Sequence, residues 1–337
     1  MQATKVLKAK AQQAGFTVLE ILVVITIMGF LIAMVAPRLA GFSSGAIDNI
    51  CDTNQNRMVG YMSQYFEKTS RYPTDLTNLI NQDGVTFGLP AVSDGNPATG
   101  AEVFAKELQD RVQLTAHTLT TAEAEELVAL GIAQVFNLND YSGTTPTTPH
   151  ASMDPVNLNA IPADFAVAMA GMGHDGTNWV VTGNERGLGE PDWFGRIVLG
   201  LGTESGLVKD GIIANAAHCP GGLQNADNAT YNDYNIVLPR LEATAARMVD
   251  ATGANITGAG DATGDVVAVA YDDNEPSTDY AVVGNSDNYR KRTFNIVEAQ
   301  EAWQFATVCP EGHMYPEDDN EFWAVDVDNS GNIEVNP

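Results

Sequence analysis

The chain has 337 residues, of which 43 are acidic and 17 are basic, and its formal net charge is −26. A surface this acidic repels nucleic-acid phosphates and anionic lipid headgroups, so the composition argues against both as partners of the folded part. The length exceeds what one small core needs, so we expect one large domain or two lobes.

The N-terminus begins with a basic leader, residues 1–15, in which Lys5, Lys8 and Lys10 stand without an acidic residue. Residues 16–36 follow as an apolar run whose single charged residue is Glu20. At a helical rise of ~1.5 Å per residue, this run is about 30 Å long, which matches the hydrocarbon core of a bilayer. Because the basic flank is N-terminal, the sequence predicts a single-pass membrane helix with a cytoplasmic N-terminus.

Glu20 is the exceptional residue of this run. A carboxylate in a membrane helix costs on the order of 3 kcal/mol, and the run contains no Lys, Arg or His that could pair with it. If the peptide bond after Gly15 is cut, Phe16 gains a free α-amino group. We therefore expect the Phe16 amine of one copy to pair with the Glu20 carboxylate of its neighbour in an assembly of helices.

Residues 15–21 (Gly-Phe-Thr-Val-Leu-Glu-Ile) resemble the leader junction of type IV pilins and type II secretion pseudopilins. The resemblance implies cleavage between Gly15 and Phe16 by a prepilin peptidase, and N-methylation of Phe16. It also implies assembly with other pilin subunits at an inner-membrane platform, into a periplasmic pseudopilus or a cell-surface filament. An uncleaved signal anchor is the plainer alternative, but an anchor has no need of Glu20.

Residues 37–70 are expected to continue the helix into the head. Pro37, Gly41 and Gly45 weaken a helix, and the resemblance places a helix-kinking proline at Pro37. From residue 46 to residue 69, side chains at spacings of three and four predict a buried helix face. The members of this face are Ile47, Cys51, Asn54, Met58, Tyr61 and Tyr65, widened by Met62 and Phe66.

The head is predicted as an α+β, pilin-like fold, in which the long N-terminal helix packs on an antiparallel sheet with large insertions. Residues 71–145 form its first part and residues 146–337 its second, divided by the Thr- and Pro-rich segment 142–149. Thr120 and Glu123 form a capping box before a helix that ends at Gly131. Strands are expected at 132–138, 165–170, 179–182, 196–201, 236–238, 266–271, 280–283 and 322–327, and helices at 241–249 and 296–305.

Two of the three cysteines precede a proline: Cys219 and Cys309. An exported domain favours disulfides, and the resemblance to pilins, many of which staple their C-terminal part, favours a Cys219–Cys309 bond. Such a bond would close a loop of about 90 residues and contribute ~4 kcal/mol in the chain-entropy model. Cys51 is then left over as a small buried residue on the long helix.

Zinc binding is the alternative for this region. His218 and Cys219, together with Cys309 and His313, supply two imidazoles and two thiolates, which is a tetrahedral zinc set if the two segments meet. The spacing does not follow a standard zinc knuckle, and an oxidising compartment favours the disulfide.

The C-terminal tail resembles the start of a calcium loop, because Asp326, Asp328, Ser330 and Asn332 alternate around Gly331. The twelfth loop position is Pro337, so the usual bidentate acid is absent. Another carboxylate from Glu317, Asp318, Asp319 or Glu321 would have to complete the shell. A plain β-hairpin is the alternative. Calcium is the cofactor that the tail suggests, beside the alternative of zinc at the cysteines.

Signatures of enzymes are missing from the sequence, including the phosphate-binding Gly-Lys-Ser/Thr, G-x-S-x-G and H-E-x-x-H patterns. We therefore expect a structural subunit and not an enzyme. An extracytoplasmic binding protein or enzyme that uses the pilin-like helix only as an anchor is the alternative.

Overall fold

The computed structural model describes residues 18–83, 86–90, 105–139, 153–171, 179–181, 185–187, 191–213, 219, 233–250, 265–271, 290–295, 298–315 and 322–326. The pattern of contacts divides the chain into two units, residues 1–49 and residues 50–337. Gly15 and Phe16 lie outside the described residues, as do the segment 142–149, His218 and residues 327–337.

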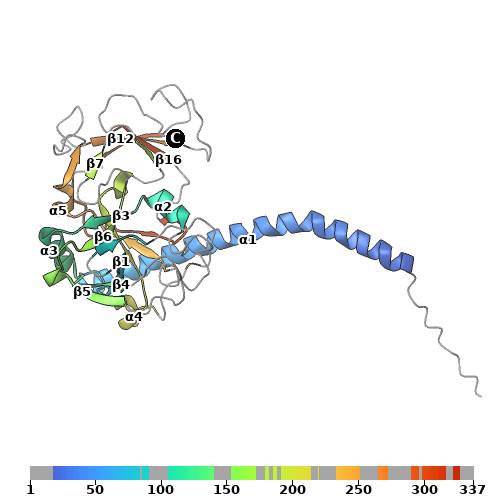
Figure 1. Cartoon of the computed structure of the whole chain (residues 1–337), viewed down its shortest axis with the longest axis horizontal. Coiled ribbons are helices and arrows are strands. Elements are labelled where there is room, and N and C mark those ends of the chain that lie inside the picture. Colours follow the sequence, from blue (N-terminus) through green and yellow to red (C-terminus); the bar gives the residue numbers. More distant parts are fainter. Residues whose placement is uncertain are drawn as a thin grey trace, which may run out of the picture. The chain divides into compact units, whose positions relative to one another are not determined.

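The N-terminal helix α1 (Val18–Thr69) is the longest element and runs through both units (Figure 1). It continues as an α-helix through Pro37, Gly41 and Gly45, so the backbone is not interrupted where the sequence predicts a loosened turn. The kink at Pro37 stays a prediction. Within the described part of the chain, no helix combines the length and the apolar character that crossing a membrane requires.

In the first unit, the described side chains of α1 are exposed, and all of them except Thr26 are apolar. Val18 is 82% exposed, Leu22 61% and Ile25 64%. Exposed apolar side chains in such a continuous row are typical of a surface that another apolar partner covers.

The remaining elements belong to the second unit. The other helices are α2 (Lys106–Val112), α3 (Thr121–Leu130), α4 (Gly206–Lys209) and α5 (Glu242–Ala245), with short 3₁₀ turns at η1 (Leu158–Ala160) and η2 (Pro191–Trp193). The main sheet contains β1 (Leu76–Asp83), β2 (Thr86–Gly88), β3 (Thr115–Thr118), β4 (Gln134–Asn139), β5 (Met153–Asn157), β6 (Ala166–Ala170), β9 (Arg196–Gly200), β10 (Asn235–Val237), β14 (Ala306–Val308) and β15 (Met314–Tyr315).

This main sheet is mixed, and not purely antiparallel as the sequence predicts. Its strand order is β15-β14-β10-β9-β1-β4-β5, with β6 also paired to β9, β3 to β6 and β2 to β1. Strands β1 and β4 run parallel, because the α2–β3–α3 segment connects them as a crossover, whereas a hairpin would make them antiparallel. Strands β4 and β5, which lie on either side of residues 142–149, pair in the same sheet.

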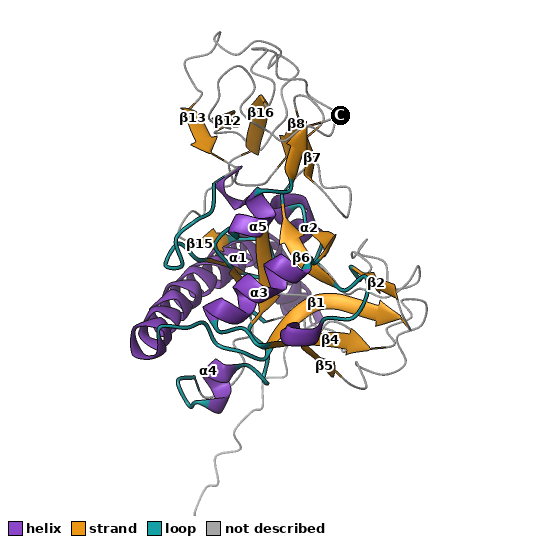
Figure 2. Ribbon diagram, turned by 90° about the vertical axis from the view of Figure 1, so that its left-hand side faces the viewer, coloured by secondary structure: helices purple, strands orange, loops and turns teal. Residues whose placement is uncertain are grey.

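Both faces of the main sheet are covered, which explains why β6 and β9 read as unbroken buried runs. Alternate residues enter two different clusters: Ile197 and Leu199 share one with Met58 of α1 and Leu127 of α3. Val198, between them, belongs to the other cluster, with Leu108 of α2. The second half of α1 and α3 therefore pack on one face, and α2 packs on the other (Figure 2).

A smaller four-stranded antiparallel sheet has the order β13-β12-β16-β8. Its strands are β13 (Arg290–Asn295), β12 (Asp265–Tyr271), β16 (Phe322–Asp326) and β8 (Glu185–Gly187). Strands β7 (Trp179–Val181) and β11 (Met248–Asp250) form a separate parallel pair.

Helix α3 follows its sequence signals closely. The Thr120 hydroxyl accepts from the backbone N–H of Glu123, and the Glu123 carboxylate accepts from the backbone N–H of Thr120. Gly131 ends the helix with a φ of 108°, a conformation that favours glycine. A Cβ at this position would also lie 2.6 Å from Cβ of Arg71, so the close approach requires glycine as well.

Two predicted helices are wrong in whole or in part. Within 241–249, the helix α5 ends at Ala245, because residues 248–250 pair with β7 as β11. Residues 298–305 contain no helix; two buried arginines bind their carbonyl oxygens. Arg240 donates to Glu298 O over 3.0 Å, and Arg196 donates to Gln304 O over 2.5 Å.

Candidate functional site

The second half of α1 carries a polar residue on its buried face. Cys51, Gln55, Met58 and Met62 are buried at helical spacing, whereas Tyr61, which the sequence places on this face, is 36% exposed. Gln55 lies on the buried face instead of Tyr61, and its side-chain amide forms hydrogen bonds inside the head. The Gln55 side chain donates to His313 O over 3.1 Å and accepts from the Thr307 hydroxyl over 3.2 Å.

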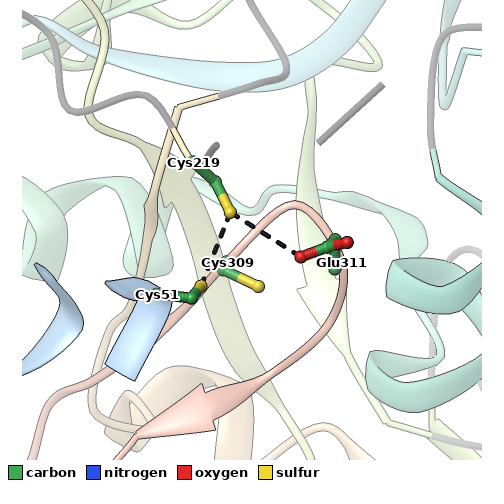
Figure 3. Close-up of side chains that lie close together, drawn as sticks. All are labelled: Cys51, Cys219, Cys309 and Glu311. Carbon is green, nitrogen blue, oxygen red and sulfur yellow. Dashed lines mark hydrogen bonds between the residues drawn. The ribbon is translucent and has the colours of Figure 1, made fainter. Parts of the chain in front are cut away.

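Cys51 lies within a cluster of three thiols and one carboxylate, which we call the thiol centre (Figure 3). Its members are Cys51, Cys219, Cys309 and Glu311, and one ligand atom of each lies within 4.8 Å of the others. The Sγ atoms of Cys51 and Cys219 are 3.5 Å apart, and Sγ of Cys219 is 3.9 Å from Oε2 of Glu311. The three cysteines are buried, and Glu311 is half-buried.

Three separate parts of the chain deliver these residues. Cys51 comes from α1, and Cys219 lies between β9 and β10 in sequence. Cys309 and Glu311 belong to the tight turn between β14 and β15, which closes by a bond from Gly312 N to Cys309 O and another from Cys309 N to His313 O. Gly312 has a φ of 82°, which a glycine adopts without strain.

Several polar groups are directed at the sulfur atoms. The Tyr234 hydroxyl donates to Sγ of Cys51 over 3.6 Å, and the Gln55 amide lies 3.7 Å from the same sulfur. Nδ1 of His313 is 3.6 Å from Sγ of Cys309 and 4.0 Å from Oε2 of Glu311. Hydrogen-bond donors around sulfur stabilise its thiolate form.

Two of the three thiols, those of Cys51 and Cys309, have a raised pKa. The hydrogen bond with Cys219, together with burial, raises the pKa of Cys51 to about 12, although the contact with Cys309 lowers it. Burial also raises the pKa of Cys309 well above its usual range. Cys51 and Cys309 are therefore protonated at neutral pH, and a metal ion that bound there would displace their protons.

The predicted Cys219–Cys309 disulfide and the predicted zinc set each share members with this centre. The structure brings Cys219 and Cys309 together and holds all three cysteines as thiols, so the disulfide stays a prediction. Of the zinc set, Cys219, Cys309 and His313 converge, and His218 lies outside the described residues.

The sequence did not identify Cys51 and Glu311 as members of the thiol centre. Cys51 was expected to be a leftover apolar residue, but it lies against Cys219, which is 168 residues away in the chain. One local signal could have pointed to Glu311, since it stands two residues from Cys309 and two residues from His313 in the sequence.

The calcium prediction is not tested. Asp326 is the last residue of β16, and Asp328, Ser330 and Asn332 lie outside the described residues, as do the acids 317–319 and 321. The processing residues Gly15 and Phe16 also lie outside them, and α1 includes Glu20 by its backbone only.

A second buried polar cluster, the Glu123 network, lies at the start of α3. Glu123 is fully buried and contacts His117 over 2.8 Å and Arg247 over 2.5 Å. The Thr244 hydroxyl and the Thr120 backbone N–H each donate to its carboxylate over 2.8 Å. Burial by itself would raise the pKa of Glu123, but His117, Thr120 and Arg247 outweigh burial and lower it to about 2. This cluster is an internal ion pair that supports the fold.

Comparison with known proteins gives two findings for the N-terminal part. The family model described as "Prokaryotic N-terminal methylation motif" matches residues 10–36, which include Gly15, Phe16 and Glu20. The type II secretion system core protein G of Xanthomonas campestris pv. campestris is 28% identical over 80 residues, which are 24% of this chain and 56% of that protein. No solved structure matches the chain.

The match to protein G thus spans little more than half of that relative, and the family model ends at Ala36, where the apolar run also ends. Residues 10–36, which the family model matches, contain the predicted cleavage junction and Glu20. The chain therefore carries a prepilin-type N-terminal motif, and over its N-terminal part it is similar to a type II secretion pseudopilin.

Proposed function

We propose that the chain is a structural subunit of a type IV pilus or a type II secretion pseudopilus. In this proposal a prepilin peptidase cleaves between Gly15 and Phe16, and Phe16 becomes N-methylated. The subunit then leaves the inner membrane at an assembly platform and joins other pilin subunits through α1. The role is structural and involves no catalysis by the head.

The observation that carries the proposal is the methylation motif at residues 10–36, whose residues from Val18 onward form the beginning of the helix α1. Apolar side chains such as Leu22 and Ile25 are exposed in the isolated chain. Burial of apolar surface contributes about 25 cal/mol per Å², so neighbouring helices that cover this surface would stabilise an assembly. Before assembly, the lipid of the inner membrane would cover it.

Glu20 would determine the register of the assembly. A subunit in the correct position brings its Phe16 amine to the Glu20 carboxylate of its neighbour, and a misplaced subunit leaves a buried charge unpaired. Breaking a buried pair costs about 3–5 kcal/mol, which is sufficient to reject the misplaced subunit.

The relative's name favours the pseudopilus form of the proposal over the surface filament, since that protein is a type II secretion core protein. The two forms differ in an observable way. A pseudopilus would leave sheared cell-surface material without filaments of this chain, and a pilus would place the chain there.

The first experiment determines the N-terminus of the protein from its native cells by mass spectrometry. We expect a chain that begins at methylated Phe16. A chain that still carries residues 1–15 and occurs as a monomer would contradict the proposal.

The second experiment tests Glu20 with a Glu20→Ala variant, and uses Glu67→Ala, an exposed acid on the same helix, as the matched control. We expect both variants to reach the membrane, and only Glu20→Ala to be absent from assembled material isolated by sedimentation. Normal incorporation of Glu20→Ala would refute the register role.

A further inference from the structure

We propose that the thiol centre is a zinc site, in which Cys51, Cys219 and Cys309 supply three thiolates and Glu311 supplies the fourth ligand. This set differs from the one that the sequence suggests, because it includes Cys51 and Glu311 and does not depend on either histidine. It is independent of filament assembly, since all four ligands belong to one chain.

The spacing of the four ligand atoms carries the first part of the argument. Zinc holds sulfur at about 2.3 Å, so two thiolates at neighbouring corners of a tetrahedron lie about 3.8 Å apart. The observed separation of Cys51 and Cys219 is 3.5 Å, and Glu311 approaches Cys219 to 3.9 Å. All four atoms fall within 4.8 Å of one another, so a cation enters with small side-chain movements.

The chemistry of the set selects the metal. Soft thiolates with one hard oxygen suit Zn²⁺, whereas Ca²⁺ and Mg²⁺ require shells of oxygen ligands. A disulfide between any two of the sulfurs would leave the third thiol and the carboxylate unused. Four-coordinate zinc uses all of them.

The surroundings supply the outer contacts that zinc sites usually have. The Tyr234 hydroxyl and the Gln55 amide approach Sγ of Cys51, and Gln55 is itself fixed by Thr307 and by His313 O. Nδ1 of His313 lies beside Cys309 and Glu311. Such contacts orient metal ligands and balance their negative charge.

The first test measures metal in the full-length protein, purified in mild detergent with a reductant and without chelators. Mass spectrometry of the elements should find one zinc ion per chain. Replacement by Co²⁺ should give the intense visible bands of a tetrahedral site together with a sulfur-to-cobalt charge-transfer band in the near ultraviolet. Protein that binds no zinc, or whose intact mass shows a disulfide in place of the metal, would overturn the proposal.

The second test assigns the ligands. Cys219→Ala should abolish stoichiometric zinc, and Glu311→Gln should weaken binding by at least about tenfold. Ser205→Ala, which removes a buried hydroxyl elsewhere in the head, and Glu298→Gln, at an exposed acid, are the matched controls and should keep their zinc. His313→Gln should also retain one zinc per chain, because His313 is a positioning residue here.

Folding of each variant is followed by circular dichroism, so that loss of zinc is not confused with loss of structure. Glu311 lies on a half-buried turn, so Glu311→Gln is the variant that tests the site even if Cys219→Ala does not fold. Unchanged zinc affinity in a folded Glu311→Gln protein would overturn the assignment of the fourth ligand. Copper or iron in place of zinc in the native protein would overturn the choice of metal.

Discussion

Two clusters in the head each contain a carboxylate, Glu123 in one and Glu311 in the other. The two carboxylates differ in the groups that surround them. In the Glu123 network the chain supplies the positive charge itself, through Arg247, and His117 adds a second close contact. In the thiol centre, Glu311 lies beside three sulfurs and one imidazole, and burial raises the pKa of Cys309. The first cluster is complete as folded, whereas the second has the composition of a site that a cation completes.

The largest expected effect comes from breaking the complete cluster. Glu123→Gln leaves Arg247 and His117 facing a neutral amide in a buried position, so we expect a loss of about 3–5 kcal/mol in the free energy of unfolding. Urea unfolding of the full chain in mild detergent measures it. Glu125→Gln, at an exposed position on the same helix, is the control and should change stability by less than about 0.5 kcal/mol. Equal effects of the two variants would show that the network contributes nothing.

Acid should have the next largest effect on the same cluster. Because the pKa of Glu123 is lowered from 4.5 to about 2 in the folded chain, its contribution is complete above pH 4.5 and is lost as the pH falls toward 2. The shift corresponds to about 3 kcal/mol. Unfolding curves recorded between pH 6 and pH 2 should show this loss in the wild type and a smaller one in Glu123→Gln. Parallel pH profiles of the two proteins would contradict the ion-pair interpretation.

The third effect in size is expected from zinc binding at the thiol centre. If the thiol centre binds zinc in the folded chain only, zinc at 100 times its dissociation constant should stabilise the head by about 2.7 kcal/mol. The Cys219→Ala protein, which retains the Glu123 network, should show no such gain. Thermal unfolding with and without a chelator measures the difference, and an equal response of both proteins would place the binding elsewhere.

The smallest effect is expected at the N-cap of α3, where Glu123 forms the capping box with Thr120. Thr120→Ala removes the hydroxyl that accepts from Glu123 N, so it should cost about 1 kcal/mol. Thr121→Ala changes the neighbouring exposed residue and should cost less. The same urea titration compares them, and a Thr120→Ala protein as stable as its control would show that the capping box is redundant.

These two clusters also show what the sequence could and could not predict. The Thr120–Glu123 capping box and the stop at Gly131 were predicted correctly, because their signals lie within a dozen residues. The methylation motif at 10–36 was recognised for the same reason. The thiol centre was predicted only in part, because Cys51 and Cys219 meet through the fold and no local pattern links them.

The two helix predictions at 241–249 and 296–305 failed for a related reason, because contacts distant in sequence decide the structure there. Residues 296–305 have helical composition, but Arg240 and Arg196 bind backbone carbonyls of this segment and replace the helical hydrogen bonds. Residues 248–250 join a strand for a similar reason, since β7 offers them a partner that the sequence cannot indicate. The parallel pairing of β1 and β4 also follows from the long connection between them and not from either strand alone.

The order in which the ligands of the thiol centre are synthesised has a consequence for how the protein matures. Cys51 leaves the ribosome 168 residues before Cys219, and the turn that carries Cys309 and Glu311 follows later still. Until that turn emerges, the early thiols have no complete partner set and stay open to exchange with any disulfide that they meet. The thiol centre can therefore form only after residue 311 has been synthesised. A Cys51 that is shielded from disulfide exchange would distinguish finished chains from truncated ones.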